Sequence, residues 1–313
     1  MSETDSLDAA RLWREALLMP GREDLARSLA TKLAEYAGGT VAETLAVMAD
    51  AQRLFAERWN REKPEAGDAD AVAAFYNRDL LEAYELSNWH AGGQGPVPLT
   101  YPIAALWLKG RGARRVLDYG SGIGSGSLVL ARAGLQPDLA DIARPLLGYA
   151  SARLRRRGID HRAVDLNAET PRPDTYDAIC CFDVLEHVPD PLRIMGGMSR
   201  SLKLGGVLLC NLPGADDGHH PMHITAFHDR TLFMLRTDVY RDRGAIEEVA
   251  GMGGDFTVLR KRRFGRLRNH LLLAALRLKR LVYRQAYAPE AAAVTAGEPR
   301  PADDAGKDQG RRS

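Results

Sequence analysis

The sequence of 313 residues predicts a doubly wound α/β fold, in which helices cover both faces of a mostly parallel sheet. One observation is the alternation, from Arg114 onward, of short apolar segments with longer segments of helical periodicity. The other is a glycine-spaced turn, Gly120-Ser121-Gly122-Ile123-Gly124, which joins the first apolar segment to a helix-like segment from Ser125 to Ala133. The expected architecture is therefore a Rossmann-like αβα sandwich.

Helical periodicity in the first 90 residues predicts a helical cap ahead of the sheet. Apolar side chains recur at spacings of three and four from Leu25 to Tyr36, and again after a break at Gly38-Gly39. A polar stretch at 60–70 predicts a linker before a further helix over 71–86. The next segment, 88–96, contains too much glycine for a helix, so we expect a loop there.

Six segments of the second part are short and apolar enough to be buried strands, although the second is only weakly apolar. They are Val116–Asp118, Pro137–Asp141, His161–Asp165, Tyr176–Phe182, Gly206–Leu212 and Phe256–Arg260. A basic, leucine-rich segment then predicts an amphipathic helix, and a tail rich in alanine, proline and charge predicts disorder. The predicted parts are the cap at 1–90, the sheet domain at 91–264, the basic helix at 265–287 and the tail at 288–313.

The composition is that of an ordinary globular protein, because 45% of the residues are apolar and 27% are charged. A net charge of +2 gives the chain no general affinity for nucleic acid or membranes. All three cysteines lie in apolar, strand-like segments, which indicates reduced, buried thiols in a cytoplasmic protein. The N-terminus has no leader pattern and no segment offers about 18 consecutive apolar residues, so we expect neither export nor a membrane span.

Asp118 distinguishes the glycine turn from one that binds a dinucleotide. The spacing is Gly-x-Gly-x-Gly rather than Gly-x-Gly-x-x-Gly, and a carboxylate two positions before Gly120 would repel a pyrophosphate but attract a cationic amino group. These residues favour a nucleoside that carries an amino acid. The segment resembles the class I S-adenosylmethionine-dependent methyltransferases, whose first motif is (Asp/Glu)-x-Gly-x-Gly-x-Gly. That family ends its sheet with a seventh, antiparallel strand, whereas the sequence after Arg260 predicts a basic helix and a tail, so either this strand is absent or it lies elsewhere than expected.

Acidic residues end three successive predicted strands, where ligands of this fold bind: Asp118, Asp141 and Asp165. The resemblance implies that they contact, in that order, the methionine ammonium, the two ribose hydroxyls and the adenine amine of S-adenosylmethionine. It also implies that the residues after the second and third acids lie against adenine, and that the end of the fourth strand borders the transferable methyl group. The predicted cofactor-binding set is Asp118, Gly120, Gly122, Gly124, Asp141, Ile142, Asp165, Leu166, Phe182 and Asp183.

A second resemblance covers 181–191, which is similar to the same segment of the small-molecule methyltransferases of the ubiquinone-biosynthesis group. The preferred interpretation is that its Glu-His pair holds the loop together before a helix that Pro191 opens. Further along, 216–228 contains four histidines on a loop above the methyl donor. Because imidazole titrates near pH 6.5, such a loop offers a general base. The predicted catalytic residues are His187, His220 and His223.

The predicted reaction needs no metal ion, but the same residues allow an alternative. Some relatives bind a divalent ion through an acid-x-x-Glu-His segment and a later histidine. The corresponding set here mixes carboxylates and imidazoles, which suit several divalent ions. Its members are Asp183, Glu186, His187 and His220.

The predicted function is transfer of a methyl group from S-adenosylmethionine to a small molecule, with oxygen as the preferred acceptor atom because of the histidines. The resemblance also gives Trp89, His90 and Tyr101 a place in the acceptor pocket, under a lid. Two alternatives stay open: an RNA or protein methyltransferase, and a non-catalytic partner subunit that binds the cofactor. The first lacks an aromatic and basic recognition segment. The basic helix either contacts an anionic membrane surface or packs on the domain.

Overall fold

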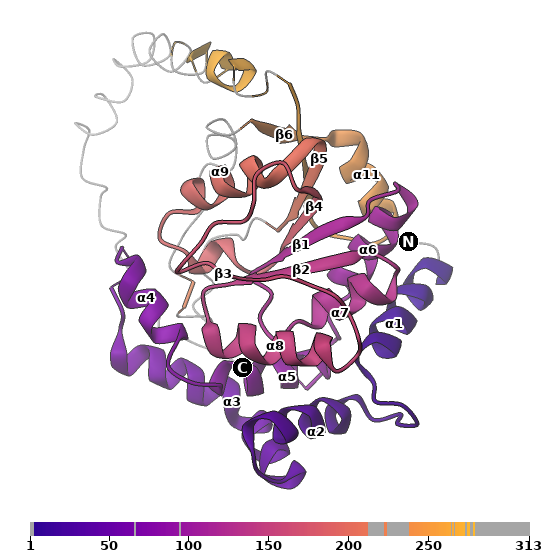
Figure 1. The fold of residues 1–313 in the computed structure, drawn as a ribbon, viewed down its shortest axis with the longest axis vertical. Helices are drawn as coiled ribbons and strands as arrows, with labels where there is room; N and C mark the ends of the chain where they lie inside the picture. Colours follow the sequence, from indigo (N-terminus) through magenta and orange to yellow (C-terminus); the bar gives the residue numbers. More distant parts are fainter. Residues whose placement is uncertain are drawn as a thin grey trace, which may run out of the picture. The chain divides into compact units, whose positions relative to one another are not determined.

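A computed structural model describes residues 3–65, 67–93, 95–211, 222–223, 238–263, 265, 267–272, 274–275 and 278. The chain divides into two compact units, Met1–His270 and Leu271–Ser313, and the first contains a sheet of seven strands (Figure 1). The strands are β1 (Arg115–Tyr119), β2 (Gln136–Asp141), β3 (Ala163–Asp165), β4 (Tyr176–Cys181), β5 (Leu202–Cys210), β6 (Val239–Arg241) and β7 (Thr257–Lys261).

The strand order is β3-β2-β1-β4-β5-β7-β6, which confirms the predicted doubly wound fold. The five strands from β3 to β5 are parallel, and β7 is antiparallel to both of its neighbours. The order reverses between β1 and β4, because the chain first builds outward from β1 through β2 to β3 and then returns to β4. In sheets of this kind the crevice for a ligand opens at that point, outside the carboxyl ends of the strands.

Helices cover both faces of this sheet. Val116 and Leu209 belong to one apolar cluster with helices α1, α6, α7 and α11, whereas their neighbours Leu117 and Leu208 belong to a second cluster with α9. Adjacent strand residues thus face opposite layers, as the period of two in a strand requires. The described helices are α1 (Glu3–Leu17), α2 (Leu25–Ala37), α3 (Val41–Glu62), α4 (Ala69–Tyr76), α5 (Leu81–His90), α6 (Thr100–Gly110), α7 (Ser125–Arg132), α8 (Arg144–Arg155), η1 (Leu185–His187), α9 (Pro191–Ser201) and α11 (Arg243–Gly251).

The N-terminal helices pack directly on the part of the fold that follows β1 and β2. Phe55 of α3 and Phe75 of α4 lie with their ring centroids 5.3 Å apart, in a cluster that also contains Ile123 of the glycine turn and Tyr149 of α8. Helix α1 instead joins the cluster on one face of the sheet. The helical nature of this segment is confirmed, while its independence as a subdomain stays a prediction.

Two expectations for the N-terminal part are wrong in detail. The single helix over 71–86 is two helices, because the chain turns at 77–80, where the Asn77 side chain donates a hydrogen bond to the Ala73 carbonyl. The loop over 88–96 begins later than expected, since α5 continues to His90. Trp13 holds that last turn by donating its indole N–H to the His90 carbonyl at 3.1 Å.

The final, antiparallel strand is present, which decides between the two possibilities that the sequence left open. The segment taken as the sixth strand is β7, and the preceding strand, β6, has only three residues. A strand this short at the edge of a sheet has no measurable periodicity in the sequence. Its pairing with β7 is supported from the following segment, because Asn269 donates a hydrogen bond to the Val239 carbonyl.

The C-terminal predictions are tested only in part. Residues 267–272 are helical, as expected, and the tail at 288–313 lies outside the described residues. Within the described part of the chain, no helix has the length and apolar character needed to cross a membrane. Contact of the basic helix with a membrane surface stays a prediction.

Candidate functional site

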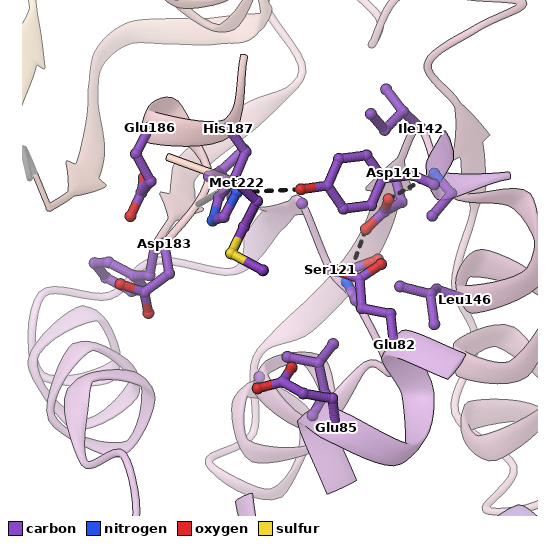
Figure 2. Close-up of a pocket in the computed structure, with 18 of the residues that line it drawn as sticks. Glu82, Glu85, Ser121, Asp141, Ile142, Leu146, Asp183, Glu186, His187 and Met222 are labelled. Carbon is purple, nitrogen blue, oxygen red and sulfur yellow. Dashed lines mark hydrogen bonds between the residues drawn. The ribbon is translucent and has the colours of Figure 1, made fainter. Parts of the chain in front are cut away.

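A cavity of about 440 Å³ opens at the carboxyl ends of β1, β2 and β4. Its lining comes from the turns that follow these strands and from the helices α3 to α6 of the N-terminal part. Figure 2 shows part of this lining, with Glu82 and Glu85 of α5 on the same cavity as Asp141 and Asp183. The position agrees with the crevice expected from the strand order. Five carboxylic residues line it, and neither lysine nor arginine is among its described lining residues. The carboxylic residues are Glu82, Glu85, Asp141, Asp183 and Glu186.

The glycine turn forms one wall of this cavity. Gly120 has a φ of +73°, and a Cβ atom added to it would overlap the Cγ2 atom of Val184. Gly122 also lines the cavity, beneath Leu86 of α5. Gly124 is absent from the described lining and faces α8 instead, where an added Cβ would come within 2.8 Å of the Ala150 Cβ. Two of the three predicted glycines therefore border the cavity, and the third allows two helices to pack closely.

Asp141 is held rigidly at the end of β2. One carboxylate oxygen accepts a hydrogen bond from the Gly122 N–H and the other from the Ala143 N–H, both at 2.8 Å. Burial raises the pKa of Asp141 to about 6, although these bonds lower it. Ile142 and Leu166, predicted to flank adenine, line the cavity as well. The end of β2 thus combines an acceptor of hydrogen bonds with an apolar wall.

The other two strand-end acids do not line the cavity among the described residues. The carboxylate of Asp118 accepts hydrogen bonds from the Tyr101 hydroxyl at 2.5 Å and the Ser127 hydroxyl at 2.7 Å. Burial raises its pKa to about 6. Asp165 instead accepts a hydrogen bond from Nε of Arg144 at 2.8 Å. Asp118 therefore reaches the cavity only through Tyr101, whose ring lines it.

The end of β4 contributes Phe182 and Asp183, both of which line the cavity as predicted. Asp183 has a φ of +55°, and its N–H donates to the side-chain oxygen of Asn211 at 2.8 Å. The Asn211 amide in turn donates to the Asp183 carboxylate. Burial raises the pKa of Asp183. No sequence signal identified Asn211, because its partner Asp183 follows the neighbouring strand and is 28 residues away in the sequence.

A carboxylate and two imidazoles meet beside this turn. The potential ligand atoms of Glu186, His187 and His223 all lie within 4.8 Å of one another. Glu186 is 3% exposed, one of its oxygens has no hydrogen-bond partner among the described residues, and burial raises its pKa to about 7. The Tyr76 hydroxyl shares a hydrogen bond of 3.2 Å with Nδ1 of His187. Asp183 of the predicted metal set does not belong to this cluster.

Two predicted groups of residues have different outcomes. Trp89, His90 and Tyr101, expected in the acceptor pocket, all line the cavity. Burial lowers the pKa of His90 to about 3, so this imidazole is neutral. His220 lies outside the described residues, and its place in the site stays a prediction.

Several lining residues come from the N-terminal helices and were missed in the sequence. Glu82 and Glu85 of α5, Tyr76 of α4 and Gln52 of α3 all border the cavity. Their helices precede the glycine turn by 30 or more residues, and their polar side chains resemble those of an exposed helical face. Only the tertiary packing brings them to the strand ends.

The comparisons with known proteins agree with this arrangement. Residues 94–247 match a family described as "Methyltransferase domain". A ubiquinone biosynthesis O-methyltransferase of Xanthomonas campestris is 36% identical over 148 residues, which cover 43% of this chain and 60% of the relative. A ubiquinone biosynthesis O-methyltransferase of Xylella fastidiosa is 36% identical over 151 residues, which cover 44% of this chain and 61% of the relative. The chain thus spans about three fifths of the length of these relatives.

Solved structures match this chain at low sequence identity and with TM-scores below 0.5. The plantazolicin methyltransferase BpumL in complex with SAH has a TM-score of 0.46 and 12% identity, over 67% of this chain and 100% of that chain. A phosphoethanolamine N-methyltransferase of Haemonchus contortus has a TM-score of 0.45 and 16% identity, over 61% of this chain and 60% of that chain. The family match and the O-methyltransferase relatives, together with the motif and strand order, identify residues 94–247 as a class I S-adenosylmethionine-dependent methyltransferase domain similar to that of the ubiquinone-biosynthesis group.

Proposed function

We propose that this protein transfers the methyl group of S-adenosylmethionine to a hydroxyl oxygen of a small molecule, in the cytoplasm. The observation that carries the proposal is one continuous cavity that joins the Asp141 end of β2 to the cluster of Glu186, His187 and His223. The first part suits a nucleoside and the second suits a hydroxyl that must lose a proton. The names of the O-methyltransferase relatives support the same acceptor atom.

The cofactor residues have roles that follow from their positions. Asp141 would accept hydrogen bonds from the ribose hydroxyls, since its carboxylate is already fixed by two backbone N–H groups. Ile142 and Leu166 would enclose the adenine ring. Phe182 and Asp183 would border the sulfonium and its methyl group, because they end the strand next to β1. The ribose and the reactive centre would then lie on opposite sides of the glycine turn.

The chain's main contribution to methyl transfer is to orient the acceptor. S-adenosylmethionine, when bound, would supply a methyl group on a sulfonium that leaves as the neutral thioether, and His187 or His223 would take the proton that the acceptor hydroxyl loses. Alignment of two reactants can lower a barrier by about 7 to 11 kcal/mol, compared with about 3 to 5 kcal/mol for a good general base. Removal of one imidazole should therefore slow the reaction without abolishing it.

The same cluster fits a divalent cation, which we propose as the alternative to an imidazole base; His187 and His223 would then be ligands of the cation and would not take the proton. Its donors are a buried carboxylate oxygen without a partner among the described residues and two imidazole nitrogens. If Nε2 of His187 bound the cation, Nδ1–H would donate to the Tyr76 hydroxyl, which would be the outer partner that orients a metal-binding histidine. A divalent ion there would lower the pKa of the acceptor hydroxyl and orient it. This proposal uses Glu186, His187 and His223 rather than the complete set predicted from the sequence.

Chelation tests the metal proposal. Exhaustive treatment of the full-length protein with a chelator should abolish most methyl transfer, and addition of Mg²⁺, Mn²⁺ or Zn²⁺ should restore it. Equilibrium dialysis against Mn²⁺ gives a second readout, in which Glu186→Gln should bind at least about tenfold more weakly than wild type because it removes one charged ligand. Full activity after chelation, with no bound Mn²⁺, would contradict the metal proposal while leaving the methyl-transfer proposal intact.

The acceptor atom is tested with matched compounds. Purified protein, S-adenosylmethionine with a labelled methyl group, and a dihydroxylated aromatic should give a labelled methyl ether. The analogue whose hydroxyls are already methylated should accept no label, because it offers no ionisable oxygen. Labelling of an aromatic amine but not of the dihydroxylated compound would contradict oxygen as the acceptor.

A further inference from the structure

Two polar atoms beside Asp141 lack hydrogen-bond partners among the described residues. They are an oxygen of Glu82 and the hydroxyl of Ser121, and both residues line the cavity. Ser121 is only 7% exposed. Figure 2 shows the Glu82 side chain extending from α5 toward Asp141 and Ser121. Three oxygen-bearing side chains therefore converge at one end of the cavity, and one of them comes from outside the matched region at 94–247.

This arrangement is unfavourable in the free protein. A buried polar group without a partner costs about 1 to 3 kcal/mol, and more if it is charged. Two neighbouring carboxylates also repel each other, and burial, followed by the charge of Asp141, raises the pKa of Glu82. No lysine or arginine is among the described lining residues, so a ligand that brings O–H donors to this end of the cavity would compensate both groups.

The position selects which part of the ligand supplies these donors. Ile142, which follows Asp141 directly, begins the apolar wall proposed for adenine, so the neighbouring ligand group is the ribose. The amino-acid end lies toward Phe182 and Asp183 at the end of β4. A ribose diol offers two O–H donors within one sugar ring, which suits two carboxylates that approach from different elements.

We propose that Glu82 and Ser121 complete the ribose site opposite Asp141, so that helix α5 of the N-terminal part is a component of the cofactor site. The inference rests on the proposed function, because it assigns the ribose of S-adenosylmethionine to this end of the cavity. It also gives the N-terminal helices a role beyond covering the acceptor. The domain at 94–247 alone would have an incomplete cofactor site.

Calorimetric binding of S-adenosylhomocysteine to the full-length protein tests this inference. Glu82→Gln should weaken binding by about tenfold or more, because the amide leaves only one oxygen that can accept from the ribose hydroxyls and puts an NH₂ group in place of the other. Ser121→Ala should weaken it by a few fold. Glu57→Gln, which changes an exposed carboxylate on α3 that pairs with Arg53, should leave binding unchanged.

Two further readouts separate a binding role from a structural one. Glu82→Gln should unfold at the same or a higher temperature than wild type when no ligand is present, since it removes repulsion from Asp141. The loss of affinity should persist with 5′-methylthioadenosine, which has the ribose but not the amino acid. Unchanged binding in Glu82→Gln, or a loss that disappears with 5′-methylthioadenosine, would overturn the inference. Failure of the wild type to bind S-adenosylhomocysteine would instead overturn the proposed function, and the inference with it.

Discussion

Asp141→Asn should bind S-adenosylmethionine at least about 100-fold more weakly than the wild-type protein, a change of about 3 kcal/mol. Both carboxylate oxygens of Asp141 accept hydrogen bonds from backbone N–H groups, at Gly122 and Ala143. An amide has only one oxygen, so its NH₂ group would face one of these donors. The substitution would disturb the glycine turn as well as weaken the contacts with the ribose hydroxyls. Equilibrium binding of the cofactor measures the effect directly.

The matched control is Asp68→Asn, because Asp68 caps α4 away from the cavity and asparagine caps helices equally well. Its affinity for the cofactor should equal that of the wild type. An Asp141→Asn protein that binds with wild-type affinity would show that this end of β2 does not hold the ribose.

The pKa of Asp141 gives this prediction a second signature. Because burial raises that pKa to about 6, the carboxylate gains a proton as the pH falls from 7 to 5 and loses part of its capacity to accept hydrogen bonds. Wild-type affinity should decrease over this range, and the decrease should be shallower in Asp141→Asn. The folding stability of the free protein changes with pH in the opposite direction to the affinity. Because the pKa of Asp141 is raised in the folded state, protonation of this carboxyl stabilises the fold at low pH, and the stabilisation is lost as the pH rises through 6.

Gly120→Ala should reduce both cofactor binding and methyl transfer by about tenfold or more. A left-handed backbone costs a residue with a Cβ about 1 to 2 kcal/mol, and here the new methyl group would also overlap a Val184 side chain. Valine has little rotational freedom about its first side-chain bond, so the strain must move the turn or the loop after β4. Both line the cavity. Initial rates at saturating acceptor and cofactor titrations measure the two effects.

Gly205→Ala separates backbone strain from the overlap. Gly205 has a φ of +85°, but no heavy atom lies within 4 Å of its added Cβ, and it does not line the cavity. The Gly205→Ala protein should unfold at a lower temperature than the wild type and bind the cofactor with unchanged affinity. A double variant that combines Gly120→Ala with Val184→Ala should recover part of the cofactor affinity that Gly120→Ala alone loses. Equal behaviour of Gly120→Ala and Gly205→Ala would refute the importance of this close approach.

Much of the sheet could be predicted because its signals are local. An apolar segment followed by a glycine turn at 120–124, and acidic residues at the ends of buried strands, are visible without tertiary information. β6 could not be found in this way, since three residues at a sheet edge depend on their pairing with β7. The break between α4 and α5 depends on a side-chain hydrogen bond of Asn77, which competes with the helix.

The candidate site shows the same limit. The position of Asp141 at the end of a predicted strand indicated that it would reach the cavity, and it does. Such a position does not reveal whether a carboxylate turns toward the ligand or toward a neighbouring helix. Asp118 turns to Tyr101 and Ser127, and Asp165 turns to Arg144. Glu82 was missed for the converse reason, because a carboxylate on a helix is usually exposed. The burial of one of its oxygens follows from packing of the N-terminal helices on the glycine turn.

The central claim is that this cavity transfers a methyl group from S-adenosylmethionine to a small molecule. The most direct test incubates the purified full-length protein with labelled S-adenosylmethionine and an extract of the source organism, which is then separated into small molecules, RNA and protein. We expect label in the small-molecule fraction, and its loss with Asp141→Asn. Label confined to RNA or protein, or no transfer despite measured cofactor binding, would contradict the claim.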